Sequence, residues 1–141
     1  VLPDAVRQSP NAAGGNGRET ILVVEDEPLV RSLMCAILQE AGHPILEAAN
    51  GIEALECTRR AARLPHLVVT DVLMPEMGGR ELAAHLRQQQ EDLKVLFVSG
   101  HVREAVGQAA AEAEHTAFLP KPFDAAQLSS KVRALLDVVP A

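Results

Sequence analysis

The chain has 141 residues, 48% hydrophobic and 23% charged, which suffices for one ordinary hydrophobic core and is too short for two typical domains. The formal net charge of -6 argues against nucleic-acid binding, because phosphate binding needs clustered Lys and Arg. No apolar run approaches the roughly 18 residues of a membrane span, and the N-terminus lacks the basic-then-apolar order of a signal peptide, so neither a membrane nor export is expected.

The first 19 residues differ in composition from the rest of the chain. Residues 1–19 are rich in Pro, Gly, Asn and Ala and show no period of 2 or 3.6, which predicts a flexible linker or tail. The chain begins with Val, which suggests a piece of something longer. From Thr20 onward, short β-branched runs alternate with longer helical patterns, as in βαβ units. We therefore expect a tail at 1–19 and one α/β domain at 20–141.

Five strands are predicted, at residues 20–25, 44–49, 67–71, 94–99 and 117–121. The first, third and fourth are nearly continuous apolar runs, as expected of strands covered on both faces. The second and fifth contain Pro44 and Pro120, and proline cannot donate to a strand ladder, so these two are the expected edges. With right-handed crossovers, the pattern predicts a (βα)5 doubly wound parallel sheet of flavodoxin-like order 2-1-3-4-5.

Five helices are predicted, at residues 27–41, 51–63, 79–90, 102–113 and 125–139. The first places Leu29, Leu33 and Ile37 on one face, which predicts an amphipathic helix with that apolar side. The last does the same with Leu128, Val132, Leu135 and Val139. The fourth is rich in alanine and has few large apolar residues, so we expect it to pack loosely.

The two cysteines, Cys35 and Cys57, both fall in predicted helices. Two thiols form no disulfide framework, which indicates a reducing, cytoplasmic setting. We interpret both as small apolar residues of half-buried helices.

Polar side chains stand at the ends of four predicted strands, where a parallel sheet of this kind has its crevice. Glu25 and Asp26 follow the first strand, Asp71 ends the third, and Ser99 and Lys121 end the fourth and fifth. Each has a plainer interpretation, such as a helix N-cap at Asp26 or a turn-former at Asp71. Their meeting at one edge, with no comparable set at the other, favours a functional site.

The residue types at this edge suit phosphoryl chemistry. Three carboxylates packed together repel one another unless a cation lies among them, and oxygen ligands with room for water suit Mg²⁺ or Mn²⁺. That cation and the Lys121 ammonium would neutralise an incoming phosphoryl group, and the Ser99 hydroxyl could donate to it. No Walker-type glycine loop is present, so the site is not expected to hold ATP.

Four stretches, "ILVVEDEP", "VVTDVLMPEMGG", "VLFVSG" and "FLPKPF", resemble the receiver domains of two-component response regulators, over essentially all of residues 20–139. They occur in order, at family-like spacing, on the predicted strand ends. The resemblance implies that Asp71 is the phospho-acceptor and takes its phosphoryl group from a phosphohistidine of a sensor histidine kinase or phosphotransfer protein. It implies a bacterial signalling module that is not an enzyme, either acting alone or as the terminal receiver of a hybrid sensor kinase.

The resemblance also implies a metal site for Mg²⁺ (or Mn²⁺). Asp26 and Asp71 would be direct ligands, Glu25 would act mainly through water, and the backbone carbonyl of Leu73 would complete the site. Three departures from the commonest pattern bear on it: Glu25 stands where Asp is frequent, Gly78 where an acidic residue often follows, and His101 two residues after Ser99. Leu73 and His101 flank the position where side chains of this family tune the lifetime of the phosphate.

The resemblance further implies a switch. Ser99 would move toward a phosphorylated Asp71 and let Phe118 turn inward, although Phe118 has a plain core position as its alternative. The surface of the fourth helix, fifth strand and fifth helix would change, and a dimer through that surface is expected. The Lys121-Pro122 bond is expected to be cis.

Two other functions share much of this pattern. An aspartate-nucleophile phosphohydrolase of the haloacid-dehalogenase kind would resemble D-x-D at the nucleophile, whereas Val72 and Leu73 follow Asp71 here. A binding module whose acidic edge is never phosphorylated is the third alternative.

Overall fold

The computed structural model describes residues 19–61, 64–74, 76–100 and 115–137. Five strands lie within these ranges: β2 (Ile21–Val24), β3 (Ile45–Ala48), β4 (Leu67–Asp71), β5 (Lys94–Ser99) and β6 (Thr116–Pro120). The described helices are α1 (Pro28–Glu40), α2 (Gly51–Arg60), α3 (Gly79–Gln89) and α5 (Ala125–Leu136). The helix predicted at 102–113 and most of the tail predicted at 1–19 lie outside the described residues.

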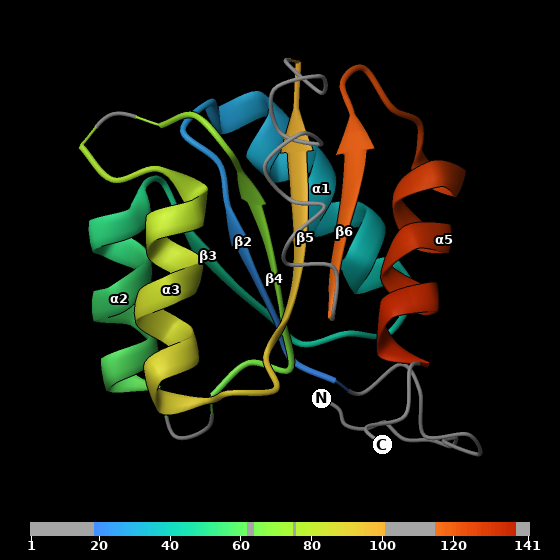
Figure 1. Cartoon of the computed structure of the whole chain (residues 1–141). Helices are drawn as coiled ribbons and strands as arrows, with labels where there is room; N and C mark the ends of the chain where they lie inside the picture. Colours follow the sequence, from blue (N-terminus) through green and yellow to red (C-terminus); the bar gives the residue numbers. More distant parts are fainter. Residues whose placement is uncertain (1–18, 62–63, 75, 101–114, 138–141) are drawn as a thin grey trace.

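The five strands form one parallel sheet in the order β3-β2-β4-β5-β6 (Figure 1). Counted along the chain this is the predicted order 2-1-3-4-5, and the two proline-containing strands are the edges. Pro44 precedes β3, where its carbonyl accepts a 3.0 Å hydrogen bond from the amide of Ile21. Pro120 is the last residue of β6. The prolines therefore stand where a missing amide donor does least harm to the ladder.

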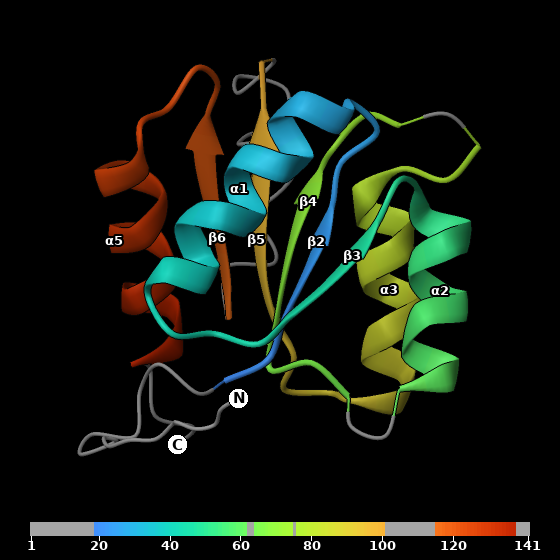
Figure 2. The ribbon, with the colours of Figure 1, turned by 180° about the vertical axis from the view of Figure 1, so that it is seen from behind.

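The sheet is covered on both faces, so that successive residues of the central strands pack on opposite sides. Helices α2 and α3 lie together against one face and α1 and α5 against the other (Figures 1 and 2). In β2, Ile21 and Val23 belong to the core on the α1 and α5 side, while Leu22 and Val24 belong to the other core. This double burial explains why β2, β4 and β5 are apolar runs without alternation.

The prediction for the apolar face of α1 was wrong for two of its three residues. The side chains of Leu29 and Leu33 are exposed, with relative accessibilities of 81% and 53%. The buried stripe is Met34, Cys35 and Leu38. Apolar residues surround most of this helix, so the i, i+4 spacing alone does not say which stripe contacts the sheet. Burial also raises the pKa of the Cys35 thiol to about 11, so this thiol stays protonated at neutral pH.

Helix α5 follows the predicted pattern and begins at a defined residue. Leu128, Val132 and Leu135 are buried, and Val139 lies outside the described residues. The helix begins after Asp124, whose side chain accepts from the amide of Gln127 while the Gln127 side chain accepts from the amide of Asp124. This reciprocal capping box sets the start of α5 after a four-residue connection from β6.

Within the part of the chain that the structure describes, none of the helices has the length and apolar character needed to span a bilayer.

Candidate functional site

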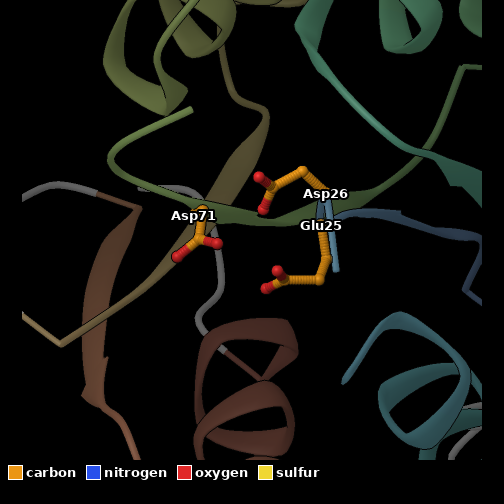
Figure 3. A group of neighbouring side chains, drawn as sticks. All are labelled: Glu25, Asp26 and Asp71. Carbon is orange, nitrogen blue, oxygen red and sulfur yellow. The ribbon is translucent and has the colours of Figure 1, made fainter. Parts of the chain in front are cut away.

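Three carboxylates meet at the carboxyl ends of β2 and β4. These neighbouring strands are parallel, with Val24 opposite Thr70, so Glu25 and Asp26 come level with Asp71. One ligand oxygen from each of the three residues lies within 4.8 Å of the others (Figure 3). Glu25 and Asp71 are buried, whereas Asp26 is exposed. The structure thus brings together the acidic residues that the sequence predicted at this edge.

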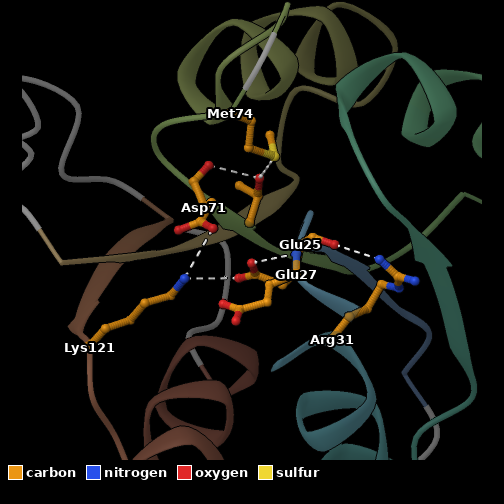
Figure 4. Close-up of polar contacts among 7 residues, drawn as sticks. Glu25, Glu27, Arg31, Asp71, Met74 and Lys121 are labelled. Carbon is orange, nitrogen blue, oxygen red and sulfur yellow. Dashed lines mark hydrogen bonds and ion pairs between the residues drawn. The ribbon is translucent and has the colours of Figure 1, made fainter. Parts of the chain in front are cut away.

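Lys121 reaches the two buried carboxylates from the end of β6. Its Nζ atom donates to Glu25 Oε1 at 3.0 Å and to Asp71 Oδ2 at 3.1 Å (Figure 4). The backbone amide of Lys121 donates to the carbonyl of Ser99 at 3.0 Å, and the Lys121-Pro122 peptide bond is cis. The lysine is therefore held by its backbone at one end and by two carboxylates at the other.

The three charged groups shift one another's proton affinities. Burial and the neighbouring Glu25 carboxylate raise the pKa of Asp71 to about 7, and Lys121 offsets this rise only in part. Burial would also raise the pKa of Glu25, but hydrogen bonds from Lys121, Asp71 and the Glu27 amide outweigh it and lower that pKa. Burial would lower the pKa of Lys121, but the two carboxylates raise it. Glu25 and Lys121 are thus the charged pair, while Asp71 exchanges a proton near neutral pH.

The turn that carries Glu25 and Asp26 has its own internal contacts. The Glu27 amide donates to Glu25 Oε2 at 3.1 Å, and Arg31 Nη1 donates to the Glu25 backbone carbonyl at 2.8 Å. The N-cap residue of α1 is Glu27, followed by Pro28, so the plainer interpretation of Asp26 as the N-cap was wrong. Sequence reasoning missed Arg31, although an arginine one turn into the helix after an acidic turn is a usable signal.

A glycine packs directly on the backbone of Asp71. The Gly79 amide donates to the Val72 carbonyl at 2.9 Å, and a Cβ atom at position 79 would lie 2.0 Å from the Asp71 carbonyl oxygen. Gly79 is therefore required by the close approach of α3 to the end of β4. Between them, Glu76 adopts the left-handed conformation at φ 72°. Gly78 is the N-cap residue of α3. As a glycine it supplies no acidic side chain to the site.

Ser99 and Phe118 lie on the β5 and β6 pair. Ser99 is buried at the end of β5, opposite Pro120. Phe118 is partly buried, opposite Phe97, and the two rings stack with centroids 5.2 Å apart and planes 25° apart. Phe97 is fully buried, so Phe118 rests on the core in this structure.

Other predicted site residues stand apart from these contacts. The side chain of Leu73, two residues after Asp71, is 59% exposed. His101 lies outside the described residues, as does the helix of the expected output surface.

The donor set fits a small divalent cation. Two buried carboxylates and one exposed carboxylate offer only oxygen atoms, the ligands that Mg²⁺ prefers. Lys121 supplies a fixed positive charge beside Asp71. The arrangement can therefore gather a negatively charged group against the Asp71 carboxylate.

The comparison with known families agrees with this geometry, since residues 21–133 match the response regulator receiver domain. The chain belongs to this family. Receiver domains of this kind are generally signalling modules without enzymatic turnover, they bind Mg²⁺, and they interact with histidine kinases or phosphotransfer proteins. Among the residues that the structure describes, the acidic cluster of Glu25, Asp26 and Asp71 is a group that could hold a metal ion.

Three relatives illustrate the likeness. The receiver is 40% identical over 122 residues to the sensor kinase CckA of Brucella abortus, covering 86% of this chain and 13% of that protein. It superposes on the receiver domain of a hybrid histidine kinase CckA with a TM-score of 0.69 at 34% identity, covering 84% of this chain and 99% of that one. The response regulator TrrA of Thermotoga maritima, solved in complex with Mg²⁺-BeF, gives a TM-score of 0.71 at 32% identity, with coverages of 83% and 98%.

Proposed function

We propose that the chain is the phospho-acceptor of a two-component phosphorelay, with Asp71 as the acceptor. The single observation that carries this proposal is the meeting of Asp71, Lys121 and two further acidic side chains at one edge of the sheet. The donor is a phosphohistidine on a sensor histidine kinase or phosphotransfer protein. The likeness to the receiver domain of a hybrid histidine kinase supports this class of donor.

In the proposed transfer, a carboxylate oxygen of Asp71 attacks the phosphorus of the phosphohistidine. The new P–O bond forms an acyl phosphate as the P–N bond breaks, and the electron pair stays on the imidazole nitrogen, which takes up a proton. Lys121 Nζ is 3.1 Å from Asp71 Oδ2. From there its ammonium would neutralise the negative charge of the phosphoryl oxygens that become bound to Asp71. The pKa of about 7 for Asp71 applies to the metal-free site, and a divalent cation beside the carboxylate would favour its ionised, attacking form.

The metal would be held by Asp26 and Asp71 directly, by Glu25 through water, and by the backbone carbonyl of Leu73. When bound, Mg²⁺ (or Mn²⁺) would supply positive charge that neutralises the phosphoryl oxygens and the clustered carboxylates. The Mg²⁺-BeF complex of the 32% identical TrrA supports such a site here.

The switch is proposed to run from Ser99 to Phe118. Ser99 is buried beside the Lys121 anchor, since its carbonyl accepts the Lys121 amide. A phosphoryl group on Asp71 would draw the Ser99 hydroxyl inward and change the position of Phe118, which stacks on Phe97 in this structure. The affected surface would include β6, α5 and the helix predicted at 102–113, which precedes β6 in the chain, and a dimer through this surface belongs to the same proposal. Leu73 and His101 are proposed to tune the lifetime of the phosphate.

The test is intact mass after incubation with acetyl phosphate, with and without Mg²⁺. We expect a phosphoryl adduct on the wild type only with Mg²⁺, and no adduct on Asp71→Asn. The matched control is Asp92→Asn, an exposed aspartate in the turn before β5, which should be phosphorylated like the wild type. An adduct that persists in Asp71→Asn would overturn Asp71 as the acceptor. Release of phosphate in many turnovers from simple esters would favour a phosphohydrolase instead.

A further inference from the structure

The backbone carbonyl of Glu25 is held by an arginine that the proposed phosphoryl transfer does not use. Arg31 lies on α1, and its Nη1 atom donates to the Glu25 carbonyl at 2.8 Å (Figure 4). Its Nε atom donates at 3.3 Å to Oε1 of Glu47 on the edge strand β3. A guanidinium is planar, so two hydrogen bonds in different directions fix its orientation. Arg31 thus ties α1, β3 and the end of β2 together at one point.

The bonded carbonyl belongs to the peptide unit that leads into Asp26. A peptide unit is planar, so fixing its oxygen also fixes the direction in which the chain enters Asp26. Asp26 is exposed, so burial does little to hold its carboxylate toward Asp71. The turn's second contact, from the Glu27 amide to Glu25 Oε2 at 3.1 Å, orients Glu25 and not Asp26.

We propose that Arg31 is a positioning residue for the metal site, which holds the Glu25 and Asp26 turn in the geometry that binds Mg²⁺. The inference rests on the proposed function, because it assigns Arg31 a role toward the same cation. Arg31 itself contacts a backbone carbonyl and Glu47, so it acts on the metal only through the turn.

Arg31 has two opposite effects on Mg²⁺ affinity, and the test depends on which of them is larger. The positive charge of Arg31 repels a divalent cation, so its removal would tighten Mg²⁺ binding if charge dominated. Glu47 offsets part of that charge, because the two side chains form an ion pair at 3.3 Å. Loss of a group that orients metal ligands commonly lowers metal affinity 10- to 100-fold. We therefore expect orientation to dominate and the affinity to fall.

The experiment measures the Mg²⁺ dissociation constant by titration calorimetry on the whole chain. Arg31→Met removes the donors and the charge, and its dissociation constant should rise about tenfold. Arg31→Lys keeps the charge and one donor, so its value should lie between that of Arg31→Met and that of the wild type. The matched control is Arg60→Met, which removes an arginine whose ion pair is with Glu56 on α2. Its affinity should stay within about a factor of two of wild type.

A second readout needs no metal. The Glu27 amide should exchange its hydrogen faster in metal-free Arg31→Met than in the wild type, because the turn that protects it is less ordered. The Ala54 amide, bonded to Asn50 at the start of α2, serves as the internal reference and should not change.

The outcomes separate this inference from the proposed function. If the wild type binds Mg²⁺ and Arg31→Met binds it equally well or more tightly, the inference is overturned and the proposed function stands. If Arg31→Met loses affinity but the Glu27 amide exchanges as in the wild type, the turn is not the route and the inference is also overturned. A wild type that binds no Mg²⁺ overturns the proposed metal chemistry, and this inference with it.

Discussion

The Nζ atom of Lys121 lies 3.1 Å from Oδ2 of Asp71, although 50 residues separate the two along the chain. The same ammonium lies 3.0 Å from Glu25 Oε1, 96 residues away. One cation therefore bridges two buried carboxylates on different strands. Because a buried charge that loses its partner is strongly destabilising, this bridge affects the stability of the fold as well as the chemistry of the site.

Lys121→Met should destabilise the metal-free protein. The change leaves Glu25, which is 1% exposed, without its cation, and we expect a loss of about 2 to 4 kcal/mol in the free energy of unfolding at pH 8. Urea unfolding measures it, and saturating Mg²⁺ should recover part of the loss because a bound cation stabilises the folded state. The control is Lys131→Met on the exposed side of α5, which should change stability by less than about 0.5 kcal/mol. A Lys121→Met variant as stable as this control would contradict the prediction.

The contribution of Asp71 to the stability of the metal-free protein should fall as pH rises from about 4 to about 7. The pKa of Asp71 is raised from 3.8 to about 7, so in this window the folded protein holds a proton that the unfolded chain has released. Asp71 therefore contributes stability that is complete below pH 3.8, is lost as pH rises through the folded pKa, and does not change further above it. Between the two ends of this pH window, the difference in free energy of unfolding between wild type and Asp71→Asn should change by about 2 to 4 kcal/mol. Unfolding at several pH values in a metal chelator measures it, and parallel pH profiles would rule the shift out.

Gly79→Ala should disturb both folding and phosphorylation. The new Cβ atom would lie 2.0 Å from the Asp71 carbonyl, so α3 or the end of β4 must move, at a cost of about 1 to 3 kcal/mol. Gly100→Ala is the matched control, because a Cβ atom there meets none of the described residues within 4 Å. The melting temperature and the extent of Mg²⁺-dependent phosphorylation should both fall for Gly79→Ala and stay near the wild-type values for Gly100→Ala. Equal behaviour of the two variants would show that α3 does not press on Asp71.

Two leucines of α1 provide a test of which face of the helix is buried. Leu38→Ala removes a fully buried side chain and should lower the free energy of unfolding by about 2 to 5 kcal/mol. Leu29→Ala removes one that is 81% exposed and should change it by less than about 0.5 kcal/mol. Urea unfolding of the two variants side by side measures the contrast, which would vanish if the Leu29 face were the packed one.

The order of the sheet could be predicted because its signals are local. Continuous apolar runs indicate strands covered on both faces, and Pro44 and Pro120 indicate edges by the chemistry of one residue each. The buried stripe of α1 was not predictable in the same way. Apolar residues lie on most sides of that helix, and only the packing of Met34 and Leu38 against the sheet distinguishes one stripe from another.

The site residues likewise differ in whether the sequence alone could locate them. Carboxylates at strand ends could be located from the sequence because parallel strands bring their carboxyl ends to one edge. The role of Gly79 could not be predicted, since it depends on the approach of α3 to the Asp71 carbonyl. The role of Arg31 was missed, although its place one turn into α1 after an acidic turn was a signal for it. The sharing of Lys121 between two carboxylates likewise depends on contacts across three strands.

The stacked rings of Phe97 and Phe118 also align the last strand. Because they are paired residues on β5 and β6, a slip of one residue would carry Phe118 to the opposite face of the sheet and break the stack. The same slip would displace Lys121 along the strand by about 3.3 Å, as much as its whole separation from the carboxylate it contacts. The stacking of Phe97 and Phe118 therefore also determines how far Lys121 reaches toward the carboxylates at the edge of the sheet.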